Sequence, residues 1–339
     1  MSVIDLDIDQ WLDERDSFEL LIDARSPCEY EYSCIVGSKN YFALDDAQHK
    51  EVGTIYKTNR ASAKVLGARY ICLNLDKHLL EISSKFRVGA KVGVYCAKGG
   101  MRSASIAHVL GMIGYRVVRL VGGYKAYRNH VLSELNRPIN MRFITLFGNT
   151  GTRKTKLINE LSPSINLEKM ANHLGSVFGS VSGKQPSQKA FEDALFERLR
   201  ELRGVKVCFI EGESRRIGEI TLPESIYKAM REDSINVEIF ADIKNRINCI
   251  LDDYCGVDRA FFDECMTKIR VFISKDAKDD AISAYSSGDN AKVAEILLTQ
   301  YYDKVYKKPA RIDCSICSDD IEYAKSKLLE ISQSLNCIA

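Results

Sequence analysis

Short apolar runs alternate with amphipathic helical patterns through the first part of the chain. The expected elements are strands at 18–23, 92–95 and 117–120, and helices at 8–16, 73–86, 103–112 and 124–135. Strands that alternate with helices are typical of a parallel sheet with helices on both faces. Pro138 disfavours helix at the residue before it. We therefore predict an N-terminal α/β domain over 1–137.

A second alternation of the same kind begins at residue 142. The expected elements are strands at 142–147, 205–210 and 236–240, and helices at 156–161, 224–232, 243–254, 261–274, 290–306 and 321–335. This pattern predicts a second α/β domain over 138–339, whose C-terminal part is mostly helical. No run of 18 apolar residues occurs, so we expect no membrane span.

The segment 96–102 (CAKGGMR) lies between an expected strand and an expected helix. Backbone N–H groups and the helix dipole favour an anion at such a place, and the thiolate is the reactive form of cysteine. Lys98 and Arg102 add positive charge nearby. A buried structural cysteine is the alternative, but it would not require a Gly-Gly loop and flanking cations. We therefore predict that Cys96 is a nucleophile, supported by Lys98 and Arg102.

The net charge of +2 conceals an uneven distribution. Residues 1–60 carry six Lys/Arg and thirteen Asp/Glu, whereas residues 82–133 carry nine Lys/Arg and no acid. A basic stretch beside an acidic one suggests a polyanionic partner, and a solvated basic surface is an equal alternative. The candidate ligands for RNA phosphates are Arg116, Arg119, Lys125 and Arg128.

The segment 148–155 (GNTGTRKT) follows the strand at 142–147 and precedes a helix. Its order of strand, glycine loop and helix is the setting of a phosphate-binding P-loop, G-x-x-x-x-G-K-[ST]. Arg153 stands where the second glycine of that pattern belongs, which can reshape the loop. An ordinary strand–turn–helix connection is the alternative. The predicted diphosphate-binding residues are Gly148, Gly151, Arg153, Lys154 and Thr155.

Charged residues follow the strand at 205–210, where a P-loop fold places a carboxylate on the metal side. Glu211 and Glu213 are candidates for that role, with Mg²⁺ as the ion, and Arg215 and Arg216 for the phosphate side. No metal ligand set is firmly assigned. Cys314 and Cys317 form a single C-x-x-C without two further ligands nearby, so we expect a surface pair.

An aromatic and basic cluster lies near the C-terminal end of the helix expected at 290–306. Its members are Tyr301, Tyr302, Lys304, Tyr306, Lys307, Lys308 and Arg311. Such a mixture can stack on bases and bind phosphates. The end of an amphipathic helix with lysines reaching to solvent is the alternative that we rank slightly higher.

Several of these motifs resemble one known family. The segments Cys96-x-x-Gly-Gly-x-Arg-Ser and 122–128 (GGYKAYR) resemble the rhodanese-type domain of tRNA 2-selenouridine synthases. The segments 45–57, 171–179 and 211–218 are similar to stretches of the same family. The proline usual in the rhodanese loop is absent from 33–40, and Arg153 departs from the P-loop pattern.

The resemblance implies an enzyme that replaces the 2-thio sulfur of a wobble uridine in tRNA with selenium. It implies selenophosphate as the selenium donor and geranyl diphosphate as the reagent that turns the sulfur into a leaving group. Cys96 would then carry the transferable atom in a persulfide-like form. We expect no tightly bound cofactor, and an enzyme that supplies selenophosphate as a further partner. The eleven cysteines show no disulfide framework, and a reducing cytoplasm is the expected setting.

Two other functions remain open from the residues. One is a rhodanese-type sulfurtransferase joined to a degenerate P-loop domain, which the arginine at position 153 favours. The other is a nucleotide-driven kinase or switch in which the rhodanese-like domain only binds.

Overall fold

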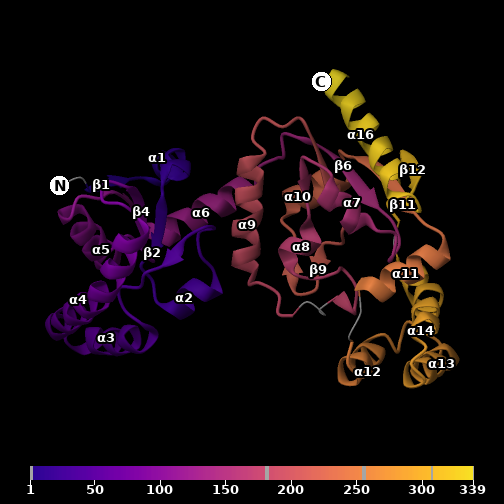
Figure 1. Cartoon of the computed structure of the whole chain (residues 1–339), viewed down its shortest axis with the longest axis horizontal. Helices are drawn as coiled ribbons and strands as arrows, with labels where there is room; N and C mark the ends of the chain where they lie inside the picture. Colours follow the sequence, from indigo (N-terminus) through magenta and orange to yellow (C-terminus); the bar gives the residue numbers. More distant parts are fainter. Residues whose placement is uncertain (1–2, 180–182, 254–256, 307, 339) are drawn as a thin grey trace. The chain divides into compact units, whose positions relative to one another are not determined.

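The computed structural model describes residues 3–179, 183–253, 257–306 and 308–338, which fold into two compact units (Figure 1). The first unit comprises Met1–Glu134 and Glu192–Glu197, and the second comprises Leu135–Phe191 and Arg198–Ala339. Each unit is built on a parallel sheet with helices packed against it. The predicted α/β class is therefore confirmed for both parts of the chain.

The sheet of the first unit has the strand order β1-β5-β4-β2-β3, with every neighbouring pair parallel. Its strands are β1 (Val3–Leu6), β2 (Leu20–Asp23), β3 (Lys39–Asn40), β4 (Lys91–Tyr95) and β5 (Arg116–Leu120). The accompanying helices are α1 (Ile8–Glu14), α2 (Pro27–Tyr32), α3 (Asp46–Thr58), α4 (Arg60–Lys85), α5 (Met101–Met112) and α6 (Gly123–Leu135). The three predicted strands are confirmed, and the helix predicted at 73–86 is the second half of α4.

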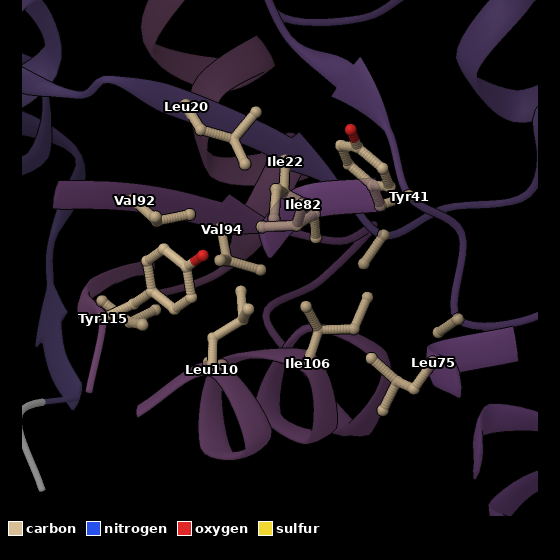
Figure 2. Packing of buried hydrophobic residues seen from close by; sticks show 14 of the residues in the cluster. Leu20, Ile22, Tyr41, Leu75, Ile82, Val92, Val94, Ile106, Leu110 and Tyr115 are labelled. Atoms are coloured by element: carbon tan, nitrogen blue, oxygen red, sulfur yellow. The ribbon is translucent and has the colours of Figure 1, made fainter. Parts of the chain in front are cut away.

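Alternate residues of the central strands point to opposite faces of this sheet. Figure 2 shows Ile22 of β2 and Val94 of β4 packed toward Ile106 and Leu110 of α5, in a cluster that also includes Ile82 of α4. Gly93 faces the other way, where a Cβ atom would lie 2.6 Å from the ring of Phe18. The carboxyl end of β4 is thus held by packing on both faces.

The sheet of the second unit has the order β12-β11-β6-β8-β7, again with parallel neighbours. Its strands are β6 (Arg142–Phe147), β7 (Ser164–Ile165), β8 (Val207–Glu211), β11 (Ile235–Phe240) and β12 (Cys314–Cys317). A separate antiparallel pair consists of β9 (Arg216–Ile217) and β10 (Ile220–Thr221). The helices are α7 (Lys154–Glu160), α8 (Leu167–Ala171), α9 (Gln188–Glu201), α10 (Glu224–Arg231), α11 (Ile243–Asp253), α12 (Arg259–Lys268), α13 (Lys275–Ser286), α14 (Asn290–Leu297), α15 (Asp303–Val305) and α16 (Ile321–Ile338).

The second unit has two hydrophobic clusters. One lies between the sheet and helices α7 and α16, where Ile144 and Phe209 meet Leu157 and Leu328. The other joins helices α11 to α14 and a π-helical turn at Leu298–Tyr302, which interrupts the continuous helix predicted at 290–306. The mostly helical C-terminal part is therefore confirmed, with the edge strand β12 inserted in it.

The C-x-x-C segment is the edge strand β12 itself. Cys314 and Cys317 are three positions apart, so their side chains leave the strand on opposite faces. This arrangement does not bring the two thiols to one metal ion. Within the described ranges, no helix is long and apolar enough to cross a membrane.

Candidate functional site

The loop that carries Cys96 connects β4 to α5 and is held by the start of α6. The backbone N–H of Tyr124 donates to the carbonyl of Cys96 at 2.8 Å, and that of Lys125 donates to Ala97 at 3.0 Å. A Cβ atom at Gly123, where φ is +58°, would lie 2.1 Å from the Cys96 carbonyl oxygen. Only glycine allows this close approach, so the Gly122-Gly123 pair sets the position of the cysteine loop.

The sulfur of Cys96 is buried at the start of α5. Cys96 is 2% exposed, and the hydroxyl of Ser103 donates a hydrogen bond to its Sγ at 3.2 Å. The same hydroxyl lies 3.1 Å from the carbonyl of Gly100. A hydroxyl donor and the N-terminus of a helix both stabilise negative charge on sulfur. The geometry therefore fits the nucleophile predicted at this position.

The two cations predicted beside Cys96 differ in their surroundings. Lys98 is exposed, whereas Arg102 binds Glu29 of α2, with Nη1 at 2.5 Å from Oε2. Burial disfavours the charged carboxylate of Glu29, but the hydrogen bond and charge of Arg102 outweigh it and lower its pKa. Glu29 also accepts a hydrogen bond from the Ser26 backbone in the capping box of α2. The ion pair between Arg102 and Glu29 thus connects α2 to the helix that the cysteine loop opens.

The four basic residues predicted to bind RNA do not form one surface. Arg116 and Lys125 are exposed, while Arg119 pairs with Asp5. Arg128 is 8% exposed, and its guanidinium pairs with Glu192 and Asp193. The prediction that Arg128 meets phosphates is therefore wrong for this structure, because that charge is buried and already compensated.

The predicted phosphate-binding loop follows β6 and leads into α7. A Cβ atom at Gly148 would lie 2.2 Å from the carbonyl oxygen of Ile239, and one at Gly151 would lie 2.8 Å from that of Arg246. Arg153 adopts the left-handed conformation, with φ 59° and ψ 25°. A glycine would adopt this conformation without strain, so the loop keeps the backbone of the glycine pattern despite the arginine.

The functional groups of this loop are bound within the second unit. The ammonium group of Lys154 donates to the carbonyl of Gly148 at 2.6 Å. The Gly148 N–H donates to the hydroxyl of Tyr306 at 2.8 Å, and the Thr155 hydroxyl donates to Glu168 at 2.6 Å. Such contacts hold the lysine over the loop, where a phosphate could replace the carbonyl oxygen as its partner.

A cavity of about 650 Å³ lies against the loop. Its lining includes Gly148, Gly151, Arg153, Lys154 and Thr155, so the structure brings the predicted diphosphate-binding residues together. We call this cavity the phosphate pocket. Its size lies in the range of small-molecule binding sites.

Arg231, at the end of α10, also lines the phosphate pocket. Its guanidinium stacks over the ring of Phe147, and its buried Nε–H has no hydrogen-bond partner. A buried donor without a partner is costly, and an anion in the pocket would satisfy it. By contrast, Arg215 and Arg216 are exposed around the small hairpin and do not line the pocket, so phosphate contact by these two remains a prediction.

Glu213 lines the phosphate pocket, and Glu211 lies beneath it at the end of β8. Burial, together with the charge of Glu168, raises the pKa of Glu213 to about 8 and that of Glu211 well above its ordinary value. These oxygens are of the kind that Mg²⁺ prefers. However, in the described residues no three His, Cys, Asp or Glu side chains converge as ligands for an ion. Because Mg²⁺ is commonly held by one or two carboxylates together with water and substrate phosphates, the magnesium site at Glu211 and Glu213 stays a prediction.

The aromatic residues near the C-terminal end of the helical region face the interior. Tyr301, Tyr302 and Tyr306 line the phosphate pocket, and the first two are 5% and 6% exposed. Stacking of these rings on RNA bases is therefore not available, and the interpretation as the end of an amphipathic helix is the better one. Lys307 lies outside the described residues.

Two family models match the chain, one for each unit. Residues 7–130 match the rhodanese-like domain, and residues 141–272 match the AAA domain of tRNA 2-selenouridine synthase. A tRNA 2-selenouridine synthase from Pseudomonas syringae pv. syringae is 33% identical over 239 residues, which are 69% of this chain and 65% of that protein. One from Bordetella petrii is 33% identical over 240 residues, 69% of this chain and 64% of that protein.

The resemblance to the tRNA 2-selenouridine synthase family is confirmed by the AAA-domain match and by these relatives, and the rhodanese-like match confirms the class of the N-terminal domain. The alignments span less than two thirds of the length of these two curated relatives, 65% of the first and 64% of the second. A crystal structure of the N-terminal domain of an ATP/GTP-binding protein from Clostridium difficile 630 is 37% identical. It covers 38% of this chain and 98% of that chain, with a TM-score of 0.34.

Both candidate sites lie inside the segments that the two family models match. Cys96 lies in the rhodanese-like match, and the loop 148–155 lies in the AAA-domain match. Arg231 also lies in the latter, but sequence reasoning missed it because nothing in an amphipathic helix indicates which end faces a distant loop. An arginine at the C-terminus of a strongly amphipathic helix was the only signal present.

Proposed function

We propose that this protein is a tRNA 2-selenouridine synthase, a transferase that replaces the sulfur of 2-thiouridine at the wobble position of tRNA with selenium. The observation that carries the proposal is that one chain has a thiol on a helix-opening loop and a predicted phosphate-binding loop. The first lies in a segment that matches a rhodanese-like domain, and the second lies in a segment that matches the AAA domain of that family. Neither loop by itself would distinguish this activity from simpler sulfur transfer or nucleotide binding.

The first proposed step attaches a geranyl group to the tRNA sulfur. The sulfur forms a bond to C1 of geranyl diphosphate, the C–O bond to the diphosphate breaks, and diphosphate leaves with both electrons, while the base loses its N3 proton to solvent. The charge that develops on the leaving group needs cationic partners. Lys154, Arg153 and Arg231 line the phosphate pocket and can supply them.

The second proposed step replaces the geranylated sulfur at C2 of the base. The selenium of selenophosphate forms a bond to C2, the C2–S bond breaks, and the sulfur leaves with both electrons and takes a proton from solvent to become geranyl thiol. Water then breaks the P–Se bond and releases phosphate, which leaves selenium on C2. We assign the handling of selenium in this step to Cys96, with the Ser103 hydroxyl stabilising its negative sulfur. Exposed Lys98 can attract the anionic donor, whereas Arg102 acts through its ion pair with Glu29.

Two mutations should separate these steps, because the attacking atom of the first step belongs to the tRNA. Cys96→Ser should accumulate tRNA with geranylated 2-thiouridine, and Lys154→Ala should leave 2-thiouridine unmodified. Mass spectrometry of nucleosides from tRNA treated with the purified variants measures both products. Cys28→Ser is the matched control, since Cys28 is an exposed cysteine of the same unit. Wild-type selenation by Cys96→Ser, or normal geranylation by Lys154→Ala, would overturn the assignment.

We propose that tRNA phosphates contact three of the exposed cations of the first unit, Lys98, Arg116 and Lys125. Neutralising Arg116 and Lys125 together should weaken tRNA binding and lower the slope of log affinity against log salt by about one unit per lost contact. Arg128→Ala should not change the slope by this mechanism, because its charge is buried. An unchanged slope in the double variant would place the RNA site elsewhere.

A plain sulfurtransferase is the second candidate, favoured by the arginine in the P-loop pattern. It predicts turnover of thiosulfate that needs Cys96 but neither tRNA nor Lys154. Rapid thiosulfate turnover without any change in tRNA nucleosides would favour it over the synthase.

A further inference from the structure

A second cavity lies in the helical region of the second unit, among α11 to α14. Its volume is about 510 Å³, far larger than the voids of a close-packed core and within the range of ligand sites. Its lining includes Phe262, Tyr285, Ala294 and Leu297, and none of its described lining residues carries a charge. We call it the apolar cavity.

The apolar cavity adjoins the phosphate pocket. Tyr302 lines both. Val177 and Cys249 line the phosphate pocket, while the residues directly after them, Phe178 and Ile250, line the apolar cavity. The two spaces therefore share a wall that includes Tyr302, and we take this ring as the place where a ligand bound at the loop 148–155 would pass into the apolar cavity.

The chemistry of the lining distinguishes between ligands. A nucleotide base would need several hydrogen-bond partners in this cavity. The hydroxyl of Tyr285 is already used, since it donates to the carbonyl of Val257 at 2.8 Å. Its ring stacks on Phe262 with centroids 4.1 Å apart and an interplanar angle of 7°. Asn290 is the one side-chain amide among the described lining residues, so the walls suit a hydrocarbon chain better than a base.

We propose that the apolar cavity binds the hydrocarbon chain of a prenyl diphosphate whose diphosphate group lies against the loop 148–155, and that its volume selects the length of that chain. This inference rests on the proposed function, because it concerns the same diphosphate substrate. It goes further by assigning the hydrocarbon chain to the α11–α14 region. Helices α13 and α14 lie more than a hundred residues beyond the loop in the sequence.

Substitutions on α14 test the inference without altering the phosphate-binding loop. Ala294→Phe fills the apolar cavity, and Leu297→Ala enlarges it. Ala291→Phe is the matched control, because Ala291 is exposed on the same helix. Isothermal titration of the full chain measures dissociation constants for inorganic diphosphate, for dimethylallyl, geranyl and farnesyl diphosphates, and for ATP as the nucleotide probe. Circular dichroism melts of each variant establish that it is folded.

Each buried methylene changes affinity by about fourfold. Geranyl diphosphate should therefore bind the wild-type chain at least about tenfold more tightly than dimethylallyl diphosphate, even with partial burial. Ala294→Phe should lose that preference and keep its affinity for inorganic diphosphate, while Ala291→Phe should keep both. Leu297→Ala should shift the preference toward farnesyl diphosphate.

Three results would overturn the inference. They are an unchanged geranyl preference in folded Ala294→Phe, an unchanged chain-length preference in Leu297→Ala, and tighter binding of a nucleotide that Ala294→Phe abolishes. If Ala294→Phe does not fold, Leu297→Ala decides. If one of these three results is found and the protein still geranylates tRNA, only the assignment of the hydrocarbon chain to the apolar cavity is wrong. If no prenyl diphosphate binds in a way that depends on Lys154, the proposed function fails as well.

Discussion

Replacing Arg153 by glycine should stabilise the second unit and weaken diphosphate binding at the same time. Arg153 has φ 59°, and a left-handed conformation costs a residue with a Cβ atom about 1–2 kcal/mol. Ordering glycine on folding costs about 0.5–1 kcal/mol more than ordering another residue, which offsets part of this gain. The net gain should be about 0.5–1 kcal/mol, or a rise in melting temperature of about 1–4 °C for a unit of this size.

The effect on binding has the opposite sign. Arg153 lines the phosphate pocket, and a charge-assisted hydrogen bond contributes about 1.5–3 kcal/mol. Its loss should raise the dissociation constant for inorganic diphosphate by at least about tenfold. Thermal melts monitored by circular dichroism measure the stability, and isothermal titration measures the binding.

Arg153→Ala is the matched control, because it removes the guanidinium but keeps the strained backbone. It should lose binding to the same extent as Arg153→Gly without the gain in melting temperature. If Arg153→Gly instead binds diphosphate more tightly than the wild type, the arginine obstructs the loop and the reasoning is refuted. Equal melting temperatures of the two variants would refute the part of the argument that concerns backbone strain.

Three further changes test other parts of the site. Arg231→Ala should weaken diphosphate binding by about tenfold, because the pocket loses a half-buried cation whose buried Nε–H has no partner, and titration with inorganic diphosphate checks this. Burial, with a neighbouring carboxylate, raises the pKa of Glu213 from 4.5 to about 8. The unfolded chain therefore loses this proton first, so the free energy of unfolding should fall as pH rises from about 4.5 to about 8. Urea unfolding at pH 5 and pH 8 measures this fall in the free energy of unfolding. The fall should be smaller in Glu213→Gln than in the wild type, and the exposed control Glu219→Gln should show the same fall as the wild type. Gly123→Ala should displace the carbonyl of Cys96 and reduce the rate of 2-selenouridine formation by about tenfold or more. Diphosphate binding by the second unit should not change. Full activity of this variant would show that the close approach is not required.

Local sequence determined the parts of this protein that depend on neighbours in the chain. The glycines after β4 and β6 indicated loops that open helices, because the conformations they permit are set within a few residues. The positions of Cys96 and Lys154 followed from that pattern. The motifs around these two residues resembled a known family on their sequence alone, without any knowledge of tertiary contacts. The short elements β1, β3 and β7 were missed, since strands of two to four residues carry too little periodicity to stand out.

Tertiary structure decided which charges are accessible and which distant residues meet. The basic stretch suggested a role for Arg128 in RNA binding, but Asp193, 65 residues away, buries and neutralises that charge. Arg231 reaches the phosphate pocket, and Glu29 restrains Arg102, because sheets and helices pack segments that are remote in sequence. The apolar cavity likewise arises from the packing of four helices. Such contacts depend on the free energy of the whole fold, and no local pattern of residues specifies them.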